Sequence, residues 1–129
     1  MLPQARVLIV EDELLIAMDL AWTVQDAGGH VVGPVASVKE ALGLAKNERL
    51  DGAILDVSLS DGEVTPVAEA LAERRIPVVM HTASEVPASV RDRFPGLAIF
   101  EKPTEPLKLA RQLAKTIVER RLEPAGVSV

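Results

Sequence analysis

Residues 7–15 read VLIVEDELL, in which four aliphatic residues run directly into Glu11, Asp12 and Glu13. The aliphatic run is typical of a strand buried on both faces. Adjacent carboxylates at the end of such a strand disfavour one another's ionised forms, which costs free energy. We therefore expect another group to compensate for this acidic crowding.

The composition indicates one domain with an aliphatic core. The chain has 129 residues, of which 48% are hydrophobic but only 2% aromatic, and this length suits a single core. It has no cysteine, which excludes disulfides and Cys-ligated zinc. A net charge of −5 and a pI near 5.0 give no electrostatic footprint for nucleic acid.

No stretch approaches the roughly 18 apolar residues of a membrane span. Residues 1–6, MLPQAR, also lack the apolar region of a signal peptide. We expect a soluble, cytoplasmic protein that binds neither membrane nor nucleic acid.

Short apolar segments alternate with segments of helical period along the chain. The apolar segments are RVLIV (6–10), HVVGPV (30–35), GAIL (52–55), PVVMH (77–81) and LAIF (97–100). Such strands, separated by helical crossovers, form a parallel sheet covered on both faces. The sequence predicts the α/β class, with a doubly wound five-stranded parallel sheet in three layers. We expect this domain to span residues 1–121, with a tail over residues 122–129 and no output domain.

Several helix ends carry their own signals. Ser37 with Glu40 forms a capping-box pattern, and Pro66 suits the first turn of the third helix. Thr104 is expected to cap the last helix.

Polar side chains follow four of the five predicted strands. Glu11 and Asp12 follow the first, Asp56 ends the third, Thr82 follows the fourth and Lys102 follows the fifth. Ligands of parallel α/β sheets bind outside the carboxyl ends of the strands, so these side chains should share one site.

The three carboxylates in this set suit a hard cation. Mg²⁺ prefers oxygen ligands, and it uses one or two protein carboxylates together with water and phosphate oxygens. A divalent cation would offset the crowding of Glu11, Asp12 and Asp56, and Lys102 would add positive charge without taking a coordination position.

The strand-end motifs together resemble the receiver domain of bacterial two-component response regulators. They are VEDE (10–13), LD (55–56), HTAS (81–84) and EKP (101–103), and the resemblance covers about residues 5 to 120. Each motif alone is weak, but four in the expected order at strand ends are specific. The resemblance implies a flavodoxin-like sheet of order 2-1-3-4-5.

The same resemblance implies a signalling function rather than an enzyme that acts on other molecules. Asp56 matches the phosphoacceptor, which takes a phosphoryl group from a sensor histidine kinase or a histidine phosphotransfer protein. Thr82 and Lys102 match the residues that bind the phosphoryl oxygens. A shift of the loop that contains Thr82 would then change the surface that a downstream protein target recognises.

The metal ligands are also implied by the resemblance. Glu11 and Asp12 match the acidic pair that holds Mg²⁺ together with Asp56, and Ser58 matches the position that coordinates the metal through its backbone carbonyl. The first helix is the usual docking face for the kinase in this family.

The chain also departs from the family pattern, which suggests a divergent branch. Ile99 stands where receivers usually carry an aromatic residue, and Phe100 beside it should point to the opposite face of the strand. Ser60 replaces a common proline, and Thr104 replaces a common phenylalanine. These changes place the usual coupling between Thr82 and an aromatic ring in doubt.

Some residues have simpler interpretations. Glu13 is expected to be a solvated residue at a helix start, and His81 an imidazole near the rim of the pocket. Met18 and Met80 are expected in the core, and Trp22 is expected to pack or to lie on the helix surface.

Three other functions remain open. An aspartate-nucleophile phosphatase would use the same residue types, but it needs a second Asp two residues after the first, where this chain has Ser58. A flavin or nucleotide module needs a Gly-rich loop after the first strand, and EDE would repel phosphates. A degenerate receiver that serves only as a docking scaffold is disfavoured by the intact Asp56, Thr82 and Lys102.

Overall fold

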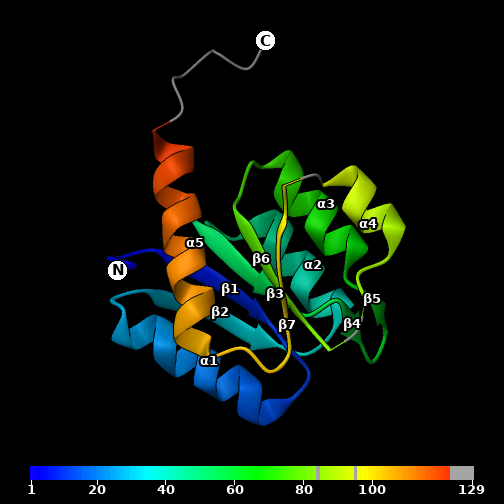
Figure 1. The fold of residues 1–129 in the computed structure, drawn as a ribbon, viewed down its shortest axis with the longest axis horizontal. Coiled ribbons are helices and arrows are strands. Elements are labelled where there is room, and N and C mark those ends of the chain that lie inside the picture. The colour runs from blue at the N-terminus through cyan, green and yellow to red at the C-terminus, as the bar shows by residue number, and fades with distance from the viewer. Residues whose placement is uncertain (84, 95, 123–129) are drawn as a thin grey trace.

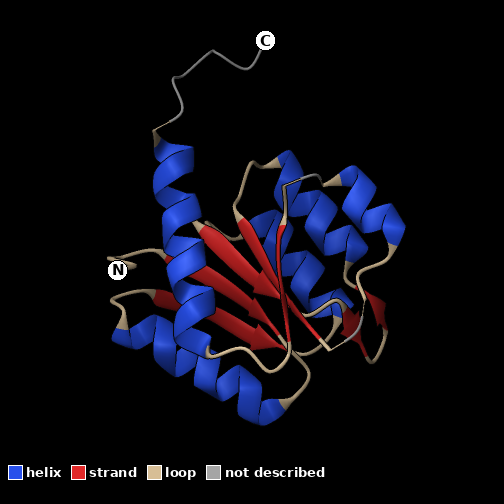
Figure 2. Ribbon diagram, in the orientation of Figure 1, coloured by secondary structure: helices blue, strands red, loops and turns tan. Residues whose placement is uncertain are grey.

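The computed structural model describes residues 1–83, 85–94 and 96–122. Five parallel strands lie between two layers of helices (Figures 1 and 2). Ser84, Pro95 and residues 123–129, which include most of the expected tail, lie outside the described residues.

The main sheet has the order β2-β1-β3-β6-β7. Counted as parallel strands only, this is the predicted order 2-1-3-4-5, so the predicted fold class is confirmed. The strands are β1 (Arg6–Val10), β2 (His30–Val35), β3 (Gly52–Leu55), β6 (Val78–Thr82) and β7 (Ala98–Glu101).

The helices cover both faces of this sheet. Helices α1 and α5 lie on one face, and α2, α3 and α4 lie on the other (Figure 1). Their bounds are α1 Leu14–Asp26, α2 Val38–Asn47, α3 Thr65–Glu73, α4 Ala88–Arg93 and α5 Pro106–Arg121.

The alternation of side chains along β1 explains why the strand is aliphatic throughout. Val7 and Ile9 pack in the core under α1 and α5, while Leu8 and Val10 pack in the core under α2 and α3. All four are at most 1% exposed. Successive residues of a strand point to opposite faces, so a strand covered on both sides has no polar position.

Helix α5 packs closely against the sheet at Gly52. A Cβ atom built on Gly52 would lie 2.9 Å from Cδ1 of Leu113 and 3.2 Å from Cδ1 of Ile117. Glycine at this position therefore sets how near α5 comes to β3.

The helix-start predictions had different outcomes. Ser37 caps α2 as predicted, because its side chain accepts a hydrogen bond from the backbone N–H of Glu40, and Pro66 lies in the first turn of α3. The expectation for Thr104 is wrong. The residue before α5 is Glu105, and the Thr104 hydroxyl instead donates to the carbonyl of Glu101.

A small antiparallel pair follows β3 and was not predicted. It consists of β4 (Ser58–Leu59) and β5 (Gly62–Glu63). Asp61 in its turn accepts hydrogen bonds from the N–H groups of Val38 at 2.8 Å and Lys39 at 3.2 Å. This contact ties the pair to the start of α2, and these bonds lower the pKa of Asp61.

Helix α1 exposes apolar side chains on the face that points away from the sheet. They are Leu14, Leu15, Met18 and Trp22, each more than half exposed. The core placement of Met18 is therefore wrong, because α1 has a second apolar face, whereas Met80 is fully buried as predicted. Within the described part of the chain, no helix combines the length and apolarity needed to span a membrane.

Candidate functional site

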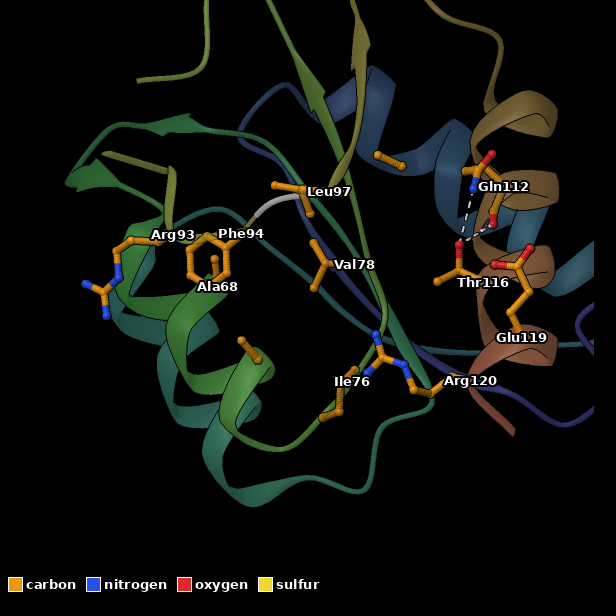
Figure 3. Close-up of a pocket in the computed structure, with 13 residues that line it drawn as sticks. Ala68, Ile76, Val78, Arg93, Phe94, Leu97, Gln112, Thr116, Glu119 and Arg120 are labelled. Atoms are coloured by element: carbon orange, nitrogen blue, oxygen red, sulfur yellow. Dashed lines mark hydrogen bonds between the residues drawn. The ribbon is translucent and has the colours of Figure 1, made fainter. Parts of the chain in front are cut away.

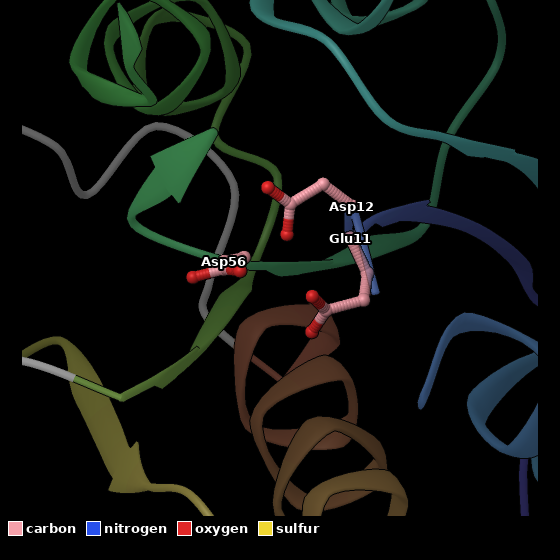
Figure 4. A group of neighbouring side chains, drawn as sticks. All are labelled: Glu11, Asp12 and Asp56. Atoms are coloured by element: carbon pink, nitrogen blue, oxygen red, sulfur yellow. The ribbon is translucent and has the colours of Figure 1, made fainter. Parts of the chain in front are cut away.

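The register of two neighbouring strands brings the acidic residues together. Val10 of β1 pairs with Leu55 of β3, so the residues that follow these two lie side by side at the same edge of the sheet. The backbone N–H of Asp56 donates to the carbonyl of Val10 at 2.9 Å. Carboxylate oxygens of Glu11, Asp12 and Asp56 all lie within 4.8 Å of one another. Figure 4 shows the side chains of Glu11 and Asp12 reaching from the end of β1 toward Asp56.

The three carboxylates differ in their exposure. Glu11 is 3% exposed and Asp56 is 5% exposed, whereas Asp12 is exposed. Buried charges need partners, so the positive group that offsets Glu11 and Asp56 should be close to both.

That group is the ammonium of Lys102. Strand β7 ends directly before this residue, and the Lys102 backbone N–H donates to the carbonyl of Thr82 at 2.8 Å. The Nζ atom lies 3.0 Å from Oε2 of Glu11, 3.1 Å from Oδ2 of Asp56 and 3.2 Å from Oε1 of Glu13. A side chain from the edge strand thus compensates carboxylates from two inner strands.

The proton affinities of these groups follow from burial and pairing. Burial raises the pKa of Glu11 to about 7, although the hydrogen bonds from Lys102 and from the backbone of Glu13 act in the opposite direction. Burial alone would lower the pKa of Lys102, but its hydrogen bonds to Glu11 and Asp56 raise it above its ordinary value. The ammonium therefore stays charged at neutral pH.

Glu13 lies in the site, which the sequence reasoning missed. It was expected to be solvated at the start of a helix, and its side chain is indeed 58% exposed. Its carboxylate nevertheless contacts Lys102, and its backbone N–H donates to Oε2 of Glu11 at 3.2 Å. The signal that could have found it is the run of three acidic residues at one strand end.

Two other predicted site residues lie beside Asp56 and Lys102. Thr82 is the last residue of β6 and is 1% exposed. Ser58 begins β4, and its backbone N–H donates to Oδ1 of Asp56 at 3.4 Å. Their roles toward phosphoryl oxygens and metal stay predictions.

His81 is more deeply buried than expected for a residue at the pocket rim. It is 3% exposed, and within the described structure neither ring nitrogen has a hydrogen-bond partner. Burial lowers its pKa, and the positive charge of Lys102 lowers it further, while Asp56 and Glu13 act in the opposite direction. The imidazole is therefore neutral near pH 7.

The residues at the usual aromatic position point as predicted. Ile99 packs against the core under α2 and α3, and Phe100 packs against the core under α5. The Nζ atom of Lys108 lies 5.7 Å from the centre of the Phe100 ring. Phe100 is therefore on the face opposite to Ile99 and does not substitute for the missing aromatic residue.

The donor set suits Mg²⁺. Three carboxylates within 4.8 Å supply hard oxygen ligands, and an octahedral Mg²⁺ with ligands at about 2.1 Å holds them roughly 3 to 4 Å apart. Glu11, Asp12 and Asp56 would hold the ion after small side-chain movements, with Lys102 giving up part of its contact to two of them.

A separate groove lies away from this cluster. It has a volume of about 400 Å³ and lies between Phe94 after α4, the start of β6 and the second half of α5. Its α5 wall consists of Gln112, Thr116, Glu119 and Arg120, and a hydrogen bond joins Gln112 to Thr116 (Figure 3). None of the strand-end residues lines it, so it is not the site that these residues form.

Comparison with known proteins places the chain in a family. Residues 7–114 match the response regulator receiver domain. The chain belongs to this family. It is 31% identical over 115 residues to the phyllosphere-induced regulator PhyR of Methylorubrum extorquens, covering 87% of this chain and 43% of that protein. It is 40% identical over 79 residues to the transcriptional regulatory protein PdtaR of Mycobacterium tuberculosis, covering 60% of this chain and 38% of that protein.

Solved structures agree with this assignment. A CheY-like response regulator receiver domain protein from Methanospirillum hungatei superposes with a TM-score of 0.82 at 26% identity, covering 94% of this chain and 99% of that one. This receiver domain spans less than half the length of the two curated relatives.

Proposed function

We propose that this receiver domain accepts a phosphoryl group on Asp56 in a two-component system or phosphorelay. The donor would be a phosphohistidine on a sensor kinase or on a phosphotransfer protein. The phosphorylated domain would then control a partner protein in the cytoplasm. In this proposal the domain promotes only its own phosphorylation and dephosphorylation.

The observation that carries the proposal is the contact between Asp56 and Lys102 inside the acidic cluster. Oδ2 of Asp56 lies 3.1 Å from Nζ of Lys102, and the Asp56 carboxylate lies within 4.8 Å of those of Glu11 and Asp12. A nucleophilic carboxylate needs positive charge nearby to meet an anionic phosphoryl group. The cluster supplies this charge from one side chain and offers ligands for a metal.

The reaction at this site is a direct transfer. A carboxylate oxygen of Asp56 forms the new O–P bond while the P–N bond to the donor imidazole breaks, and the nitrogen leaves with the bonding electron pair. Bound Mg²⁺ would supply charge to the phosphoryl oxygens, and in this proposal the backbone carbonyl of Ser58 would be one of its ligands. Lys102 would bind another phosphoryl oxygen, and Thr82 would approach the group by a shift of its loop.

The apolar face of α1 supports a docking site for the phosphodonor. Leu14 follows Glu13, so this face begins directly beside the acidic cluster, and it continues to Trp22 at 67% exposed. Asp19 and Asp26 lie on the same helix and are exposed. An apolar stripe next to acidic groups suits a partner helix that carries apolar and basic side chains.

The proposal is tested by phosphorylation with a small molecule. The protein is incubated with acetyl phosphate and Mg²⁺ and read by intact mass. We expect a gain of one phosphoryl group in the wild type, none in Asp56→Asn, and the full gain in the control Glu73→Gln, which removes an exposed carboxylate from α3. Equal labelling of Asp56→Asn and the wild type would show that a residue other than Asp56 accepts the phosphoryl group. An absence of label on the wild type, with both a small donor and phosphohistidine donors, would favour the docking-scaffold alternative.

A further inference from the structure

We infer that Glu13 is a positioning residue for Lys102: it keeps the ammonium beside Asp56 when the buried carboxylates bind a divalent cation. This inference rests on the proposed function, because it concerns the same site. It assigns a role at the site to Glu13, which the sequence pattern predicted only as a solvated residue at a helix start.

The first observation is the set of partners around Nζ of Lys102. Glu11, Asp56 and Glu13 lie at 3.0, 3.1 and 3.2 Å. The first two belong to the cluster of carboxylates that could hold a metal, and Glu13 does not. Of the three carboxylates that Lys102 contacts, Glu13 is thus the one that a metal ion would leave available.

The second observation is that the Glu13 side chain does not cap helix α1. Glu13 is the N-cap residue of α1, where an acidic side chain ordinarily accepts a hydrogen bond from a backbone N–H of the first turn. Its side chain makes no such bond. It reaches to Lys102 instead, and its backbone N–H donates to Oε2 of Glu11 at 3.2 Å, which holds the Glu13 backbone beside Glu11.

The contact between Glu13 and Lys102 would matter most when a metal ion is bound. A divalent cation among the carboxylates repels an ammonium and takes up the oxygens that it used as acceptors. A lysine side chain is long and flexible, so without another acceptor Lys102 would swing away from Asp56. Glu13 holds the ammonium within reach of the place where a phosphoryl group attaches.

One test observes Lys102 itself. The Lys102 ammonium protons are followed by NMR in the wild type, in Glu13→Gln and Glu13→Ala, and in Glu73→Gln as the matched charge control, since Glu73 is an exposed carboxylate of α3. Backbone signals of Glu11 and Asp56 report Mg²⁺ binding. With saturating Mg²⁺, we expect a slowly exchanging ammonium signal in the wild type and the control, and its loss by fast exchange in both Glu13 variants. Equal protection in all four proteins would overturn the inference.

A second test uses the rate of phosphorylation by acetyl phosphate at saturating Mg²⁺. Loss of a negative charge alone would speed the approach of this anionic donor, whereas a displaced Lys102 would slow the reaction. We expect Glu13→Gln to react about three- to tenfold more slowly, since a charged hydrogen bond is replaced by a neutral one. We expect no further slowing in a Lys102→Met background.

The two tests separate this inference from the proposed function. An unchanged or faster rate in Glu13→Gln contradicts the positioning role while leaving Asp56 as acceptor. If the wild type takes no phosphoryl group at all, the proposed function fails, and the NMR comparison still decides the role of Glu13.

Discussion

The Lys102 ammonium lies 3.1 Å from Oδ2 of Asp56, although the two residues are 46 positions apart in the chain. Their side chains are 9% and 6% exposed, so each buries a charge that the other compensates. Lys102 follows β7, the edge strand of the sheet, and its ammonium contacts both buried carboxylates of the acidic cluster. The proposed binding of Mg²⁺ by these carboxylates would therefore be linked to the stability of the fold.

Replacement of Lys102 by methionine should destabilise the metal-free protein. Removing one partner of a buried ion pair leaves an uncompensated charge, which costs about 3 kcal/mol. Because the carboxylates then lack their cation, added Mg²⁺ should raise the Tm of Lys102→Met more than that of the wild type. Thermal unfolding with and without Mg²⁺ measures both effects.

The control for this prediction is Lys108→Met, which removes an exposed lysine from α5. It should change stability by less than about 1 kcal/mol and leave the response to Mg²⁺ at the wild-type value. Equal losses of unfolding free energy in the two variants would show that the contacts of Lys102 with the carboxylates add no stability.

Replacement of His81 by leucine should remove a pH-dependent loss of stability. Burial and then Lys102 lower the pKa of His81 below its ordinary value of 6.5. The unfolded chain therefore takes up the proton first, so this contribution to stability is complete above 6.5 and is lost as the pH falls through the lower folded value. Denaturant unfolding between about pH 8 and about pH 5 should show a shallower acid-side decline in His81→Leu.

The same variant should be at least as stable as the wild type near neutral pH. Neither ring nitrogen has a hydrogen-bond partner in the described structure, and exchanging such a group for an apolar one of similar size gains about 1 kcal/mol. His30→Leu, at an exposed position, should leave the acid-side decline in place. If the stability of His81→Leu fell as steeply with decreasing pH as that of the wild type, His81 would not be the source of the acid-side decline.

The predictable part of the molecule is the part fixed by strand polarity. Continuous aliphatic segments identified the parallel strands, and their carboxyl ends located Glu11, Asp56 and Lys102, because residues that follow parallel strands must meet at one edge. The side chains of Glu11 and Asp56 converge because Val10 pairs with Leu55. The sequence predicts the shared edge of the sheet but not this register.

The residues that the sequence did not place depend on side-chain direction. Glu13 contacts Lys102 instead of capping α1, and Met18 points outward because α1 is apolar on two faces. The β4–β5 pair spans only two residues per strand, which is too short for any periodicity to be detected. Such details are decided by tertiary contacts.

Replacement of Gly52 by alanine tests the packing of α5 on the sheet. The new methyl group would lie 2.9 Å from Cδ1 of Leu113, so the buried leucine and isoleucine side chains must shift. Overpacking of this kind costs about 1 to 3 kcal/mol. Gly43→Ala, in α2 with no atom near the added methyl group, should instead be neutral or stabilising by about 1 kcal/mol. Denaturant midpoints distinguish the two, and equal effects would contradict the close approach.

The apolar face of α1 should be needed for phosphotransfer from a protein donor but not from a small molecule. Met18 is 57% exposed and Trp22 is 67% exposed, and neither belongs to the acidic cluster. Loss of a large apolar contact at the centre of an interface costs about 2 kcal/mol, so Met18→Ala and Trp22→Ala should each slow transfer from the cognate phosphohistidine donor at least about tenfold. The rate with acetyl phosphate should stay at the wild-type value.

The measurement uses phosphorylated histidine kinases and phosphotransfer proteins from the same genome, screened first against the wild type to find the donor that reacts fastest. Val118→Ala is the matched control, because Val118 is an apolar residue of α5 that is 54% exposed. An equal loss in Val118→Ala, or a loss with acetyl phosphate in the α1 variants, would contradict docking on α1. The control should keep the wild-type rate with both donors, because Val118 lies near the C-terminal end of α5, whereas the proposed docking face of α1 begins beside the carboxylates at the end of β1.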